Sequence, residues 1–171
     1  MTEFKIQLLG LQHSRAAFTC GIEALDRYLH KQASQDVSKH VAAAFVLTPD
    51  GAKIAGFYTL SATSVKLDQF PEHFAIKLPR YESVPATLLG RLAIATDFRG
   101  QGLGEFLLID VMKRVLLTTR DIASAAIVVD AKDVSARQFY LRYDFIPLPL
   151  HQNRLFFPVK KIAKQFGVSR E

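Results

Sequence analysis

The chain has 171 residues, of which 49% are hydrophobic and 22% are charged. These values are ordinary for a globular protein and exclude a disordered or low-complexity chain. Its 22 Lys and Arg residues outnumber its 16 Asp and Glu residues, so the net charge is +6, which favours polyanionic partners such as nucleic acid or phosphorylated cofactors.

Length and hydropathy also bound the organisation of the chain. We expect a single domain over residues 1–171, because this length supports one compact core. No apolar run reaches the ~20 residues that cross a bilayer, and the first residues lack the layout of a secretory signal, so we expect a cytoplasmic protein with no membrane partner. The lone Cys20 has no Cys or His at metal-ligand spacing, which predicts a small buried thiol and no metal site.

The first half of the chain predicts a strand, a helix, a hairpin and then an irregular connection. Alternating residues indicate the strand, and apolar residues at helical spacing indicate the helix. Two strand-like runs flank the turn sequence PDGAK, which predicts an antiparallel hairpin. Prolines mark the connection. In chain order these segments are residues 4–9, 21–40, 41–47, 54–61 and 65–85.

The second half alternates buried strands with amphipathic helices. The predicted segments are a strand at 86–95, a helix at 102–119, a strand at 124–131, a helix at 134–145 and short strands at 145–150 and 154–159. The element order is therefore β-α-β-β-β-α-β-α-β-β, which indicates an α/β fold with a mixed sheet.

A glycine-rich turn lies between the buried strand at 86–95 and the helix that follows it. Unpaired N–H groups and the helix dipole favour a bound anion there, and glycines allow the backbone to approach it closely. The turn therefore predicts a pyrophosphate site, and a tight turn without a ligand is the alternative. The spacing fits neither a Walker loop nor a dinucleotide loop. The residues of this site are Arg99, Gly100, Gln101, Gly102, Leu103 and Gly104.

The turn, its preceding strand and the later segment SARQFYLRYDF resemble the Gcn5-related N-acetyltransferase (GNAT) family. Arg99, Gly102 and Gly104 match the R-x-x-G-x-G pattern with which that family binds the pyrophosphate of acetyl-coenzyme A (acetyl-CoA). The resemblance implies a mixed, mostly antiparallel central sheet flanked by helices, and acetyl-CoA as co-substrate. It also implies that the backbone of Leu92, Ala93 and Ile94 contacts the coenzyme and supplies an oxyanion donor. In related enzymes the position of Ser135 contacts the coenzyme, and helix capping would explain this serine equally well.

Three further segments resemble the acetyltransferase toxins of bacterial toxin–antitoxin pairs. These segments are FTCGIEALDRYLHKQA, LGRLAI, and FYLRYDFIPL followed by RLFFPVKKI. The resemblance implies that the chain acetylates the α-amino group of aminoacyl-tRNA and so inhibits translation. It also implies a ribbon-helix-helix antitoxin as partner and a homodimer.

Acetyl transfer from a thioester to an amine needs a neutral nucleophile, stabilisation of an oxyanion and a proton for the departing thiolate. Tyr140 occupies the position at which the family commonly places a tyrosine near the coenzyme sulfur, so we assign it as general acid; an aromatic core residue is the alternative. No residue is nominated as general base. A free α-amine has a pKa near 8, which esterification lowers further, so the absence of a base favours the tRNA substrate.

A charged tRNA needs cations near the acceptor cleft. The available side chains are Arg80, Arg91, Arg142, Lys160, Lys161 and Lys164. Arg91 begins the strand segment that contacts the coenzyme, so it could bridge substrate and active site or form an ion pair with a sheet neighbour. The tail at residues 151–171 also carries Arg154 and Arg170 and a single acid, Glu171, and predicts either an anionic docking face or a solvated helix face.

Two other functions stay open at this point. The first is an ordinary acetyltransferase that acts on a protein N-terminus, a lysine or a small amine, and it would share every coenzyme residue. The second is a binding module that holds nucleic acid or an antitoxin without catalysis.

Overall fold

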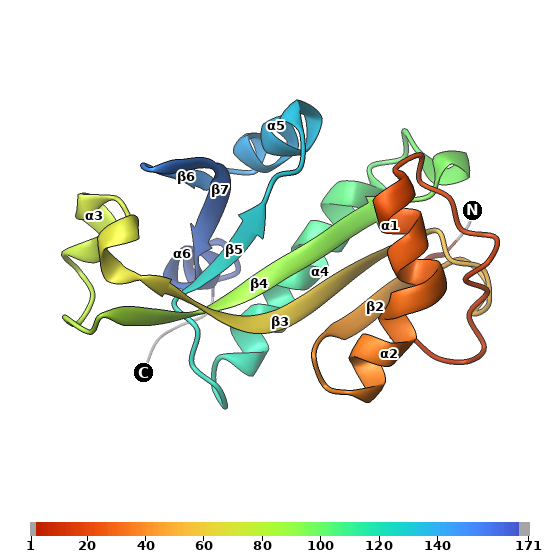
Figure 1. The fold of residues 1–171 in the computed structure, drawn as a ribbon, viewed down its shortest axis with the longest axis horizontal. Helices are drawn as coiled ribbons and strands as arrows, with labels where there is room; N and C mark the ends of the chain where they lie inside the picture. The colour runs from red at the N-terminus through yellow and green to blue at the C-terminus, as the bar shows by residue number, and fades with distance from the viewer. Residues whose placement is uncertain (1–2, 168–171) are drawn as a thin grey trace. The chain divides into compact units, whose positions relative to one another are not determined.

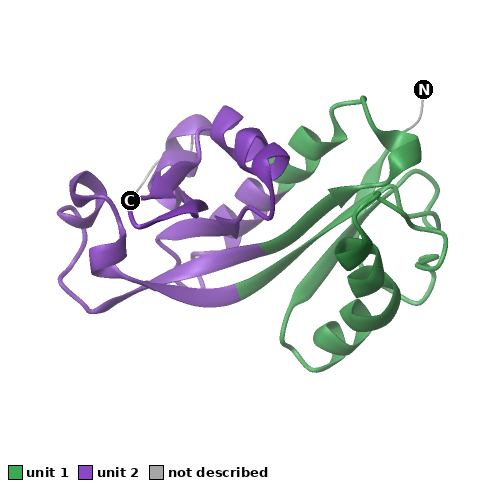
Figure 2. Cartoon of the chain, turned by 45° about the horizontal axis from the view of Figure 1, so that its top comes forward, with its two compact units in different colours: residues 1–61, 90–110 green, residues 62–89, 111–171 purple. Residues whose placement is uncertain are grey.

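The computed structural model describes residues 3–167, which form two compact units (Figure 2). Unit 1 holds the described part of residues 1–61 together with 90–110, and unit 2 holds residues 62–89 together with the described part of 111–171. The chain passes from one unit to the other inside two long strands and one long helix. The prediction of one domain over residues 1–171 stays a prediction.

Figure 1 shows the strands and helices of the described residues. The strands are β1 (Lys5–Leu8), β2 (Ala43–Thr48), β3 (Gly56–Lys66), β4 (Ser83–Ile94), β5 (Ala126–Asp130), β6 (Ile146–Leu148) and β7 (His151–Pro158). The helices are α1 (Glu23–Arg27), η1 (Tyr28–Gln32), α2 (Ala33–Ser38), η2 (Leu67–Gln69), α3 (Glu72–Ala75), η3 (Thr96–Phe98), α4 (Leu103–Thr118), α5 (Val134–Arg142) and α6 (Val159–Gln165).

The strands form one sheet in the order β1-β2-β3-β4-β5-β7-β6. The pairs β1–β2, β2–β3, β5–β7 and β6–β7 are antiparallel, and β4–β5 is parallel. The predicted α/β fold with a mixed, mostly antiparallel sheet flanked by helices is confirmed. The element order differs from the prediction because the structure adds the short helix α3 and the C-terminal helix α6.

The hairpin of unit 1 forms as its turn sequence predicts. Strands β2 and β3 pair antiparallel, and Leu47 lies opposite Gly56. The Thr48 hydroxyl oxygen accepts from the N–H of Gly51 at 2.8 Å, and the Asp50 carboxylate accepts from the N–H of Lys53 at 2.7 Å. Gly51 has a φ of 87°, a conformation that glycine adopts without a Cβ clash.

The predicted helix at 21–40 is not one regular helix. A π-helical turn, η1, separates α1 from α2. A π turn holds more residues than an α turn, so it shifts the face that points inward. Tyr28 and Leu29 of this turn are both buried. Ile22, which the regular spacing places inside, lies before α1 in an extended conformation and is exposed.

Successive β4 residues face opposite sides of the sheet in unit 1, as the pleat requires. Ala93 packs in a buried cluster with Tyr28, Leu29 and Phe57, on the side of α1 and η1. Ile94 points to the other side: a Cβ on Gly56 would lie 2.8 Å from its Cδ1 and 3.3 Å from a methyl group of Leu107 in α4. Gly56 therefore permits the close approach of α4 to the sheet.

Unit 2 corrects the expectation of a long irregular connection at 65–85. Strand β3 continues to Lys66, and η2 and α3 follow before β4 starts at Ser83. The prolines do not mark an irregular segment, because Pro71 is the N-cap residue of α3 and Pro85 lies inside β4. Apolar side chains of this segment pack over one face of β4, β5, β6 and β7; they include Val65, Phe70, Phe74 and Leu78.

Aromatic side chains cover the opposite face of unit 2. Phe157 of β7 lies beside Ile127 in the β5–β7 register, and its ring centroid is 5.3 Å from that of Phe145. Phe145 in turn packs against Tyr140 of α5 with a centroid distance of 5.2 Å. Helix α6 places Ile162, fully buried, in the core of the same unit.

Candidate active site

The glycine-rich turn follows the end of β4 in unit 1. Gly100 and Gly102 have φ values of 79° and 75°, and a Cβ built on either would meet no atom within 4 Å. Among the described residues, no acceptor is found for the backbone N–H groups of Gly100, Gln101 and Gly102. Leu103 then starts α4, a helix of 16 residues. The turn therefore presents open, unpaired amides at a helix N-terminus, which suits a pyrophosphate.

Arg99 ties this turn to the loop before α1. Its guanidinium donates a hydrogen bond to the carbonyl oxygen of Cys20. The N–H of Cys20 donates to the Asp26 carboxylate at 2.8 Å, and the Thr19 hydroxyl donates to the other oxygen at 3.0 Å. Arg99 therefore has a structural contact that the motif did not reveal, although the residue as a whole is exposed.

The predicted burial of Cys20 is confirmed, since only 2% of its surface is exposed. Burial raises the pKa of the Cys20 thiol, so the group stays protonated and unreactive at neutral pH. Burial also raises the pKa of Asp26, but the hydrogen bonds from Cys20 and Thr19 outweigh burial and lower it overall. This loop is a firm anchor for Arg99.

The strand segment Leu92–Ile94 is the last part of β4. The parallel register of β4 with β5 runs from Thr87 to Leu89, so the segment lies further along β4 than the last of these pairs. Ala95, which follows it, donates its N–H to Ala55 at 2.8 Å. The segment is followed by Ala95, η3 and then the glycine turn, and its contact with the coenzyme stays a prediction.

Tyr140 lies in the last turns of α5 in unit 2 and is only 7% exposed. Its ring packs against Phe139 and Phe145, so it is also a core aromatic residue. Its hydroxyl has no hydrogen-bond partner among the described residues. Burial raises the pKa of the Tyr140 hydroxyl well above its usual value near 10, so the group keeps its proton at neutral pH. A buried phenol that is protonated and unpaired can serve as a proton donor.

Ser135 does not cap α5. The cap is Asp133, whose carboxylate accepts from the N–H of Ala136 at 2.8 Å. Capping therefore no longer explains Ser135, which is exposed in the first turn of the helix. An acidic residue directly before the helical run was the sequence signal that could have identified the cap.

Five of the proposed tRNA-binding cations belong to unit 2, on three separate segments. Lys160, Lys161 and Lys164 lie on α6, Arg142 ends α5, and Arg80 follows α3. All are exposed except Lys161, whose ammonium lies 5.1 Å from the centroid of the Phe157 ring.

The C-terminal segment at residues 151–171 offers fewer unpaired cations than its sequence indicates. Arg154 forms an ion pair with Asp130 at 3.1 Å, and the two residues are cross-strand neighbours in the β5–β7 register. Arg154 is therefore not free for a substrate. Arg170 and Glu171 lie outside the described residues.

Arg91 is the remaining cation and belongs to unit 1. The ion pair that sequence analysis left open is not formed with any described carboxylate. Instead the central carbon of its guanidinium lies 3.5 Å from the centroid of the Tyr28 ring. Tyr28 was not among the predicted site residues, because no local pattern connects a residue in the early helix with one in β4.

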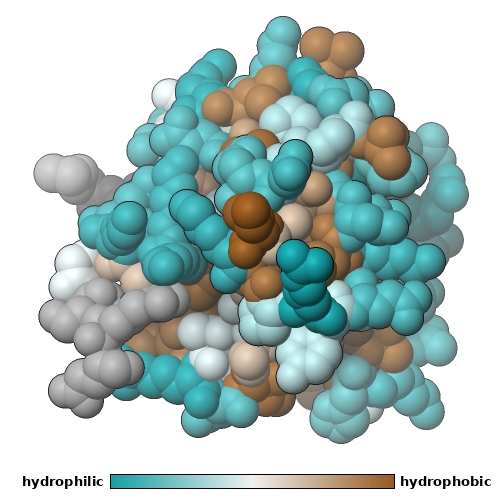
Figure 3. All heavy atoms as spheres, turned by 90° about the vertical axis from the view of Figure 1, so that its left-hand side faces the viewer, coloured by the Kyte–Doolittle hydropathy of each residue, from teal (hydrophilic) through white to brown (hydrophobic). Residues whose placement is uncertain are grey.

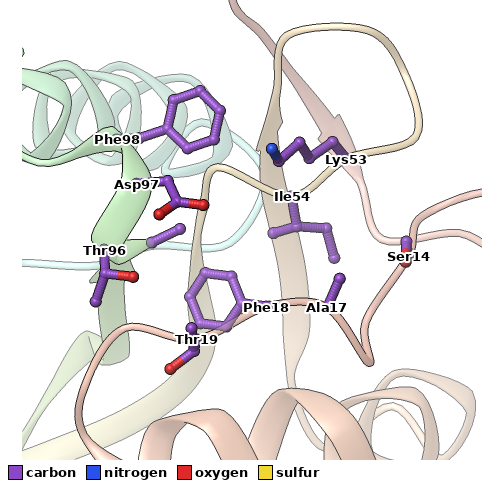
Figure 4. A pocket seen from close by; sticks show the side chains of 10 residues that line it. Ser14, Ala17, Phe18, Thr19, Lys53, Ile54, Thr96, Asp97 and Phe98 are labelled. Carbon is purple, nitrogen blue, oxygen red and sulfur yellow. The ribbon is translucent and has the colours of Figure 1, made fainter.

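Each unit contains one hollow that could be a substrate site. The hollow of unit 1 measures about 30 Å³ and lies between the loop of Phe18, the turn at Lys53 and Ile54, and the segment Ala95–Phe98 (Figure 4). This volume suits a water molecule and is too small for a nucleotide or an amino acid. Lys53 closes one side, with its ammonium 5.2 Å from the centroid of the Phe98 ring.

The hollow of unit 2 measures about 340 Å³ and lies at the N-terminal end of β4. Its lining includes Leu78, Tyr81, Val84 and Ala125 and no charged side chain, so it does not suit a phosphate. Tyr81 and Leu150 of this unit are also highly exposed. Figure 3 shows one face of the molecule, on which apolar residues lie among hydrophilic ones.

Within residues 3–167, no three His, Cys, Asp or Glu side chains gather as they would around a metal ion. None of the helices in that range combines the length and apolar character that a bilayer crossing requires.

Comparison with known proteins identifies the family to which the chain is similar. A family model described as an acetyltransferase (GNAT) domain matches residues 75–158. A probable toxin TacT from Sinorhizobium fredii is 30% identical over 164 residues, which cover 91% of each chain. A tRNA-acetylating toxin from Mycobacterium tuberculosis is 36% identical over 151 residues, which cover 88% of this chain and 89% of that protein.

Solved structures agree with these relatives. A crystal structure of a KacT mutant superposes with a TM-score of 0.89 at 30% identity and covers 95% of this chain and 99% of that chain. AtaT complexed with acetyl-methionyl-tRNAfMet also gives a TM-score of 0.89, at 29% identity, covering 96% of this chain and 99% of that chain. The chain therefore belongs to the GNAT acetyltransferase family, among the relatives that include tRNA-acetylating toxins.

Proposed function

We propose that this chain is the toxin of a type II toxin–antitoxin pair and transfers the acetyl group of acetyl-CoA to the α-amino group of aminoacyl-tRNA. The observation that carries the proposal is similarity over almost the whole chain to a tRNA-acetylating toxin and to AtaT solved with acetyl-methionyl-tRNAfMet. This similarity reaches well beyond the coenzyme motif, so it favours the toxin function over a general acetyltransferase.

The residues of the glycine turn fit the coenzyme. The open backbone at Gly100 and Gly102 leaves room for a pyrophosphate, and the unpaired amides supply donors. In this proposal Arg99, Gly100, Gln101, Gly102, Leu103 and Gly104 hold the pyrophosphate, and Leu92, Ala93 and Ile94 pair with the pantetheine arm. Ser135 contributes a further contact. Acetyl-CoA supplies the thioester, and AtaTR has been solved with this molecule bound.

Tyr140 holds the proton that the leaving thiolate needs. Its phenol stays protonated because it is buried, and its hydroxyl is not engaged by a described residue. A backbone N–H of Leu92–Ile94 serves as the oxyanion donor. Two solved relatives, KacT and AtaT, were crystallised with one tyrosine replaced by phenylalanine.

The acceptor amine needs no strong base in this proposal. Esterification of the amino acid lowers the pKa of its α-amine below the usual value near 8, so much of it is neutral at physiological pH. Water can carry the released proton. A lysine amine, with a pKa near 10.4, would require a stronger base.

The partners follow from the same relatives. AtaT has been solved bound to the C-terminus of its antitoxin AtaR, and KacTA with DNA. We propose a ribbon-helix-helix antitoxin for this chain, a homodimer as the active form, and the cytoplasm as location, because charged tRNA is found there. The cations Arg80, Arg91, Arg142, Lys160, Lys161 and Lys164 contribute to tRNA binding.

The test is an acetyl-transfer assay with radiolabelled acetyl-CoA and a mixture of charged tRNAs. The expected result is label on the aminoacyl group, recovered as N-acetyl amino acid after mild hydrolysis of the ester. Uncharged tRNA is the control and must stay unlabelled. Label on a peptide N-terminus or a lysine, with none on charged tRNA, would support a general acetyltransferase, and the absence of acetyl-CoA binding would support a binding module.

A further inference from the structure

We propose that Arg91, held flat against Tyr28, is the receptor for the phosphodiester that precedes the terminal adenosine of the aminoacyl-tRNA. This inference rests on the proposed function and names the part of the substrate that Arg91 binds. Tyr28 acts as a positioning residue, because it contacts Arg91 and not the substrate.

The arrangement of Arg91 is rigid. A guanidinium carbon 3.5 Å from a ring centroid stacks on the ring, which fixes the plane of the guanidinium. The Tyr28 ring cannot move freely, since it stacks on Phe57 at an angle of 12° and only 6% of the residue is exposed. Its hydroxyl donates to the Asp36 carboxylate at 2.9 Å.

The donors of Arg91 are unused. No described residue accepts a hydrogen bond from its guanidinium, and no described carboxylate pairs with it. No atom of Arg91 is among the buried side-chain atoms that lack a hydrogen-bond partner, so its donors keep access to solvent. A fixed, unpaired guanidinium fork is a receptor for a planar or tetrahedral oxyanion, and it loses little entropy when it binds one.

The position of Arg91 separates it from the pyrophosphate site. Arg91 directly precedes Leu92 on β4, whereas the glycine turn begins at Arg99, after the end of β4 and the short helix η3. Three residues of extended strand span ~10 Å, so the guanidinium starts well upstream of the turn that suits the coenzyme phosphates. Pleat alternation also points Arg91 to the side of Ala93 and Tyr28, away from Ile94 and α4.

The chemistry of the acceptor then selects the ligand. In aminoacyl-tRNA the carboxyl group of the amino acid is esterified and its amine is neutral or positive. The nearest anion is therefore the phosphodiester beside the terminal adenosine. A guanidinium fork binds a phosphate with two parallel hydrogen bonds, which a lysine cannot reproduce.

The experiment compares three acceptors with the same aminoacyl group: charged tRNA, the aminoacyl-CCA trinucleotide and aminoacyl-adenosine, which has no phosphate. In Arg91→Lys the KM should rise about tenfold for the first two acceptors, because one bidentate charged contact is lost. The KM for aminoacyl-adenosine, the kcat and the Kd of acetyl-CoA should stay within about twofold. Arg120→Gln, an exposed arginine after α4, is the matched control and should change none of these values.

Substitutions of Tyr28 give an independent test of the inference. Tyr28→Leu removes the stacking ring and should raise the same two KM values, whereas Tyr28→Phe keeps the ring and should restore them. A merely structural role would change all acceptors and the thermal midpoint together. If Tyr28→Leu does not fold, Arg91→Lys decides alone.

Three results would overturn the inference. They are an equal rise of KM for aminoacyl-adenosine, a weaker Kd for acetyl-CoA in Arg91→Lys, and a loss confined to kcat. Failure of the proposed function is distinguishable, because in that case the wild-type protein would not acetylate charged tRNA at all.

Discussion

Two tyrosines, one in each unit, are equally buried and differ in what their hydroxyls contact. Burial, followed by the hydrogen bond to Asp36, raises the pKa of Tyr28 to about 12. Burial alone raises the pKa of Tyr140, which has no partner among the described residues. The Tyr140 hydroxyl is not among the buried atoms that lack a partner, so a ligand can reach it, whereas the paired hydroxyl of Tyr28 supports the fold.

The same contrast separates two glycine turns of unit 1. Gly51 and Gly102 both have positive φ, and a Cβ on either would meet open space. The N–H of Gly51 finds an acceptor in the Thr48 hydroxyl, whereas the N–H of Gly102 finds none among the described residues. Polar groups that form hydrogen bonds within the chain stabilise the fold, whereas polar groups without such a partner are available to a ligand.

The largest effect should come from Tyr140→Phe. Removing the proton donor should lower kcat for acetyl transfer about 10²- to 10⁴-fold while the thermal midpoint changes little, since the ring still packs against Phe145. Initial rates with labelled acetyl-CoA measure this. Tyr143→Phe, which removes a hydroxyl from a half-buried neighbour, is the control. Equal rates in wild type and Tyr140→Phe would remove the chemical role from the open hydroxyl.

Gly102→Ala should weaken acetyl-CoA binding about tenfold, because the Cβ disfavours the positive φ that presents the amides and strains the backbone by about 1–2 kcal/mol. Isothermal titration with acetyl-CoA measures the Kd. Gly51→Ala carries the same backbone strain at a φ of 87° and should lower the free energy of unfolding equally without changing the Kd. A similar loss of affinity in both variants would mean that general destabilisation, and not the open turn, is responsible.

Tyr28→Phe should have a smaller effect, and on stability. It removes one hydrogen bond to Asp36, which still accepts from the Gln32 side chain at 2.9 Å. The free energy of unfolding should fall by about 0.5–1.5 kcal/mol, with kcat unchanged. Urea denaturation measures the first and the transfer assay the second. A large drop in kcat with normal stability would make Tyr28 the chemical tyrosine and reverse the comparison.

The smallest expected effect is the loss of stability at low pH that His13 causes. His13 is a buried polar side chain, and both of its ring nitrogen atoms form hydrogen bonds within the chain. Its Nδ1 accepts from the N–H of Gly10 at 3.0 Å, so its Nε2 donates to the Gln7 side chain at 2.9 Å and the ring is neutral. Burial, and then the charge of Arg15, lower the pKa of His13 from its usual 6.5. A lowered pKa favours the neutral ring in the folded state, so this stabilisation is complete above about pH 6.5 and is lost as the pH falls below it.

Urea denaturation at pH 7.5 and pH 5.5 measures the His13 contribution. The loss of stability at the lower pH should be smaller in His13→Gln than in wild type. An identical loss in both proteins would show that other groups cause the pH dependence.

Local patterns determined much of this protein. The hairpin turn, the buried strand and the helix after the glycine turn each depend on neighbouring residues, so period and turn chemistry predicted them. The positive φ of the glycine turn and the helix that follows it are likewise properties of a short segment, whereas the pyrophosphate site there stays a prediction. The family resemblance then supplied Tyr140, which periodicity alone would leave in the core.

Only the tertiary structure decided which side chains are satisfied. The stacking of Arg91 on Tyr28, the anchoring of Arg99 on Cys20 and the pairing of Arg154 with Asp130 each join residues far apart in the chain. The π turn at Tyr28 escaped prediction for the same reason: packing against Phe57 favours it, whereas local propensity favours a regular helix. Free and occupied cations look alike in a sequence, because the difference lies in the partner that folding brings to each one.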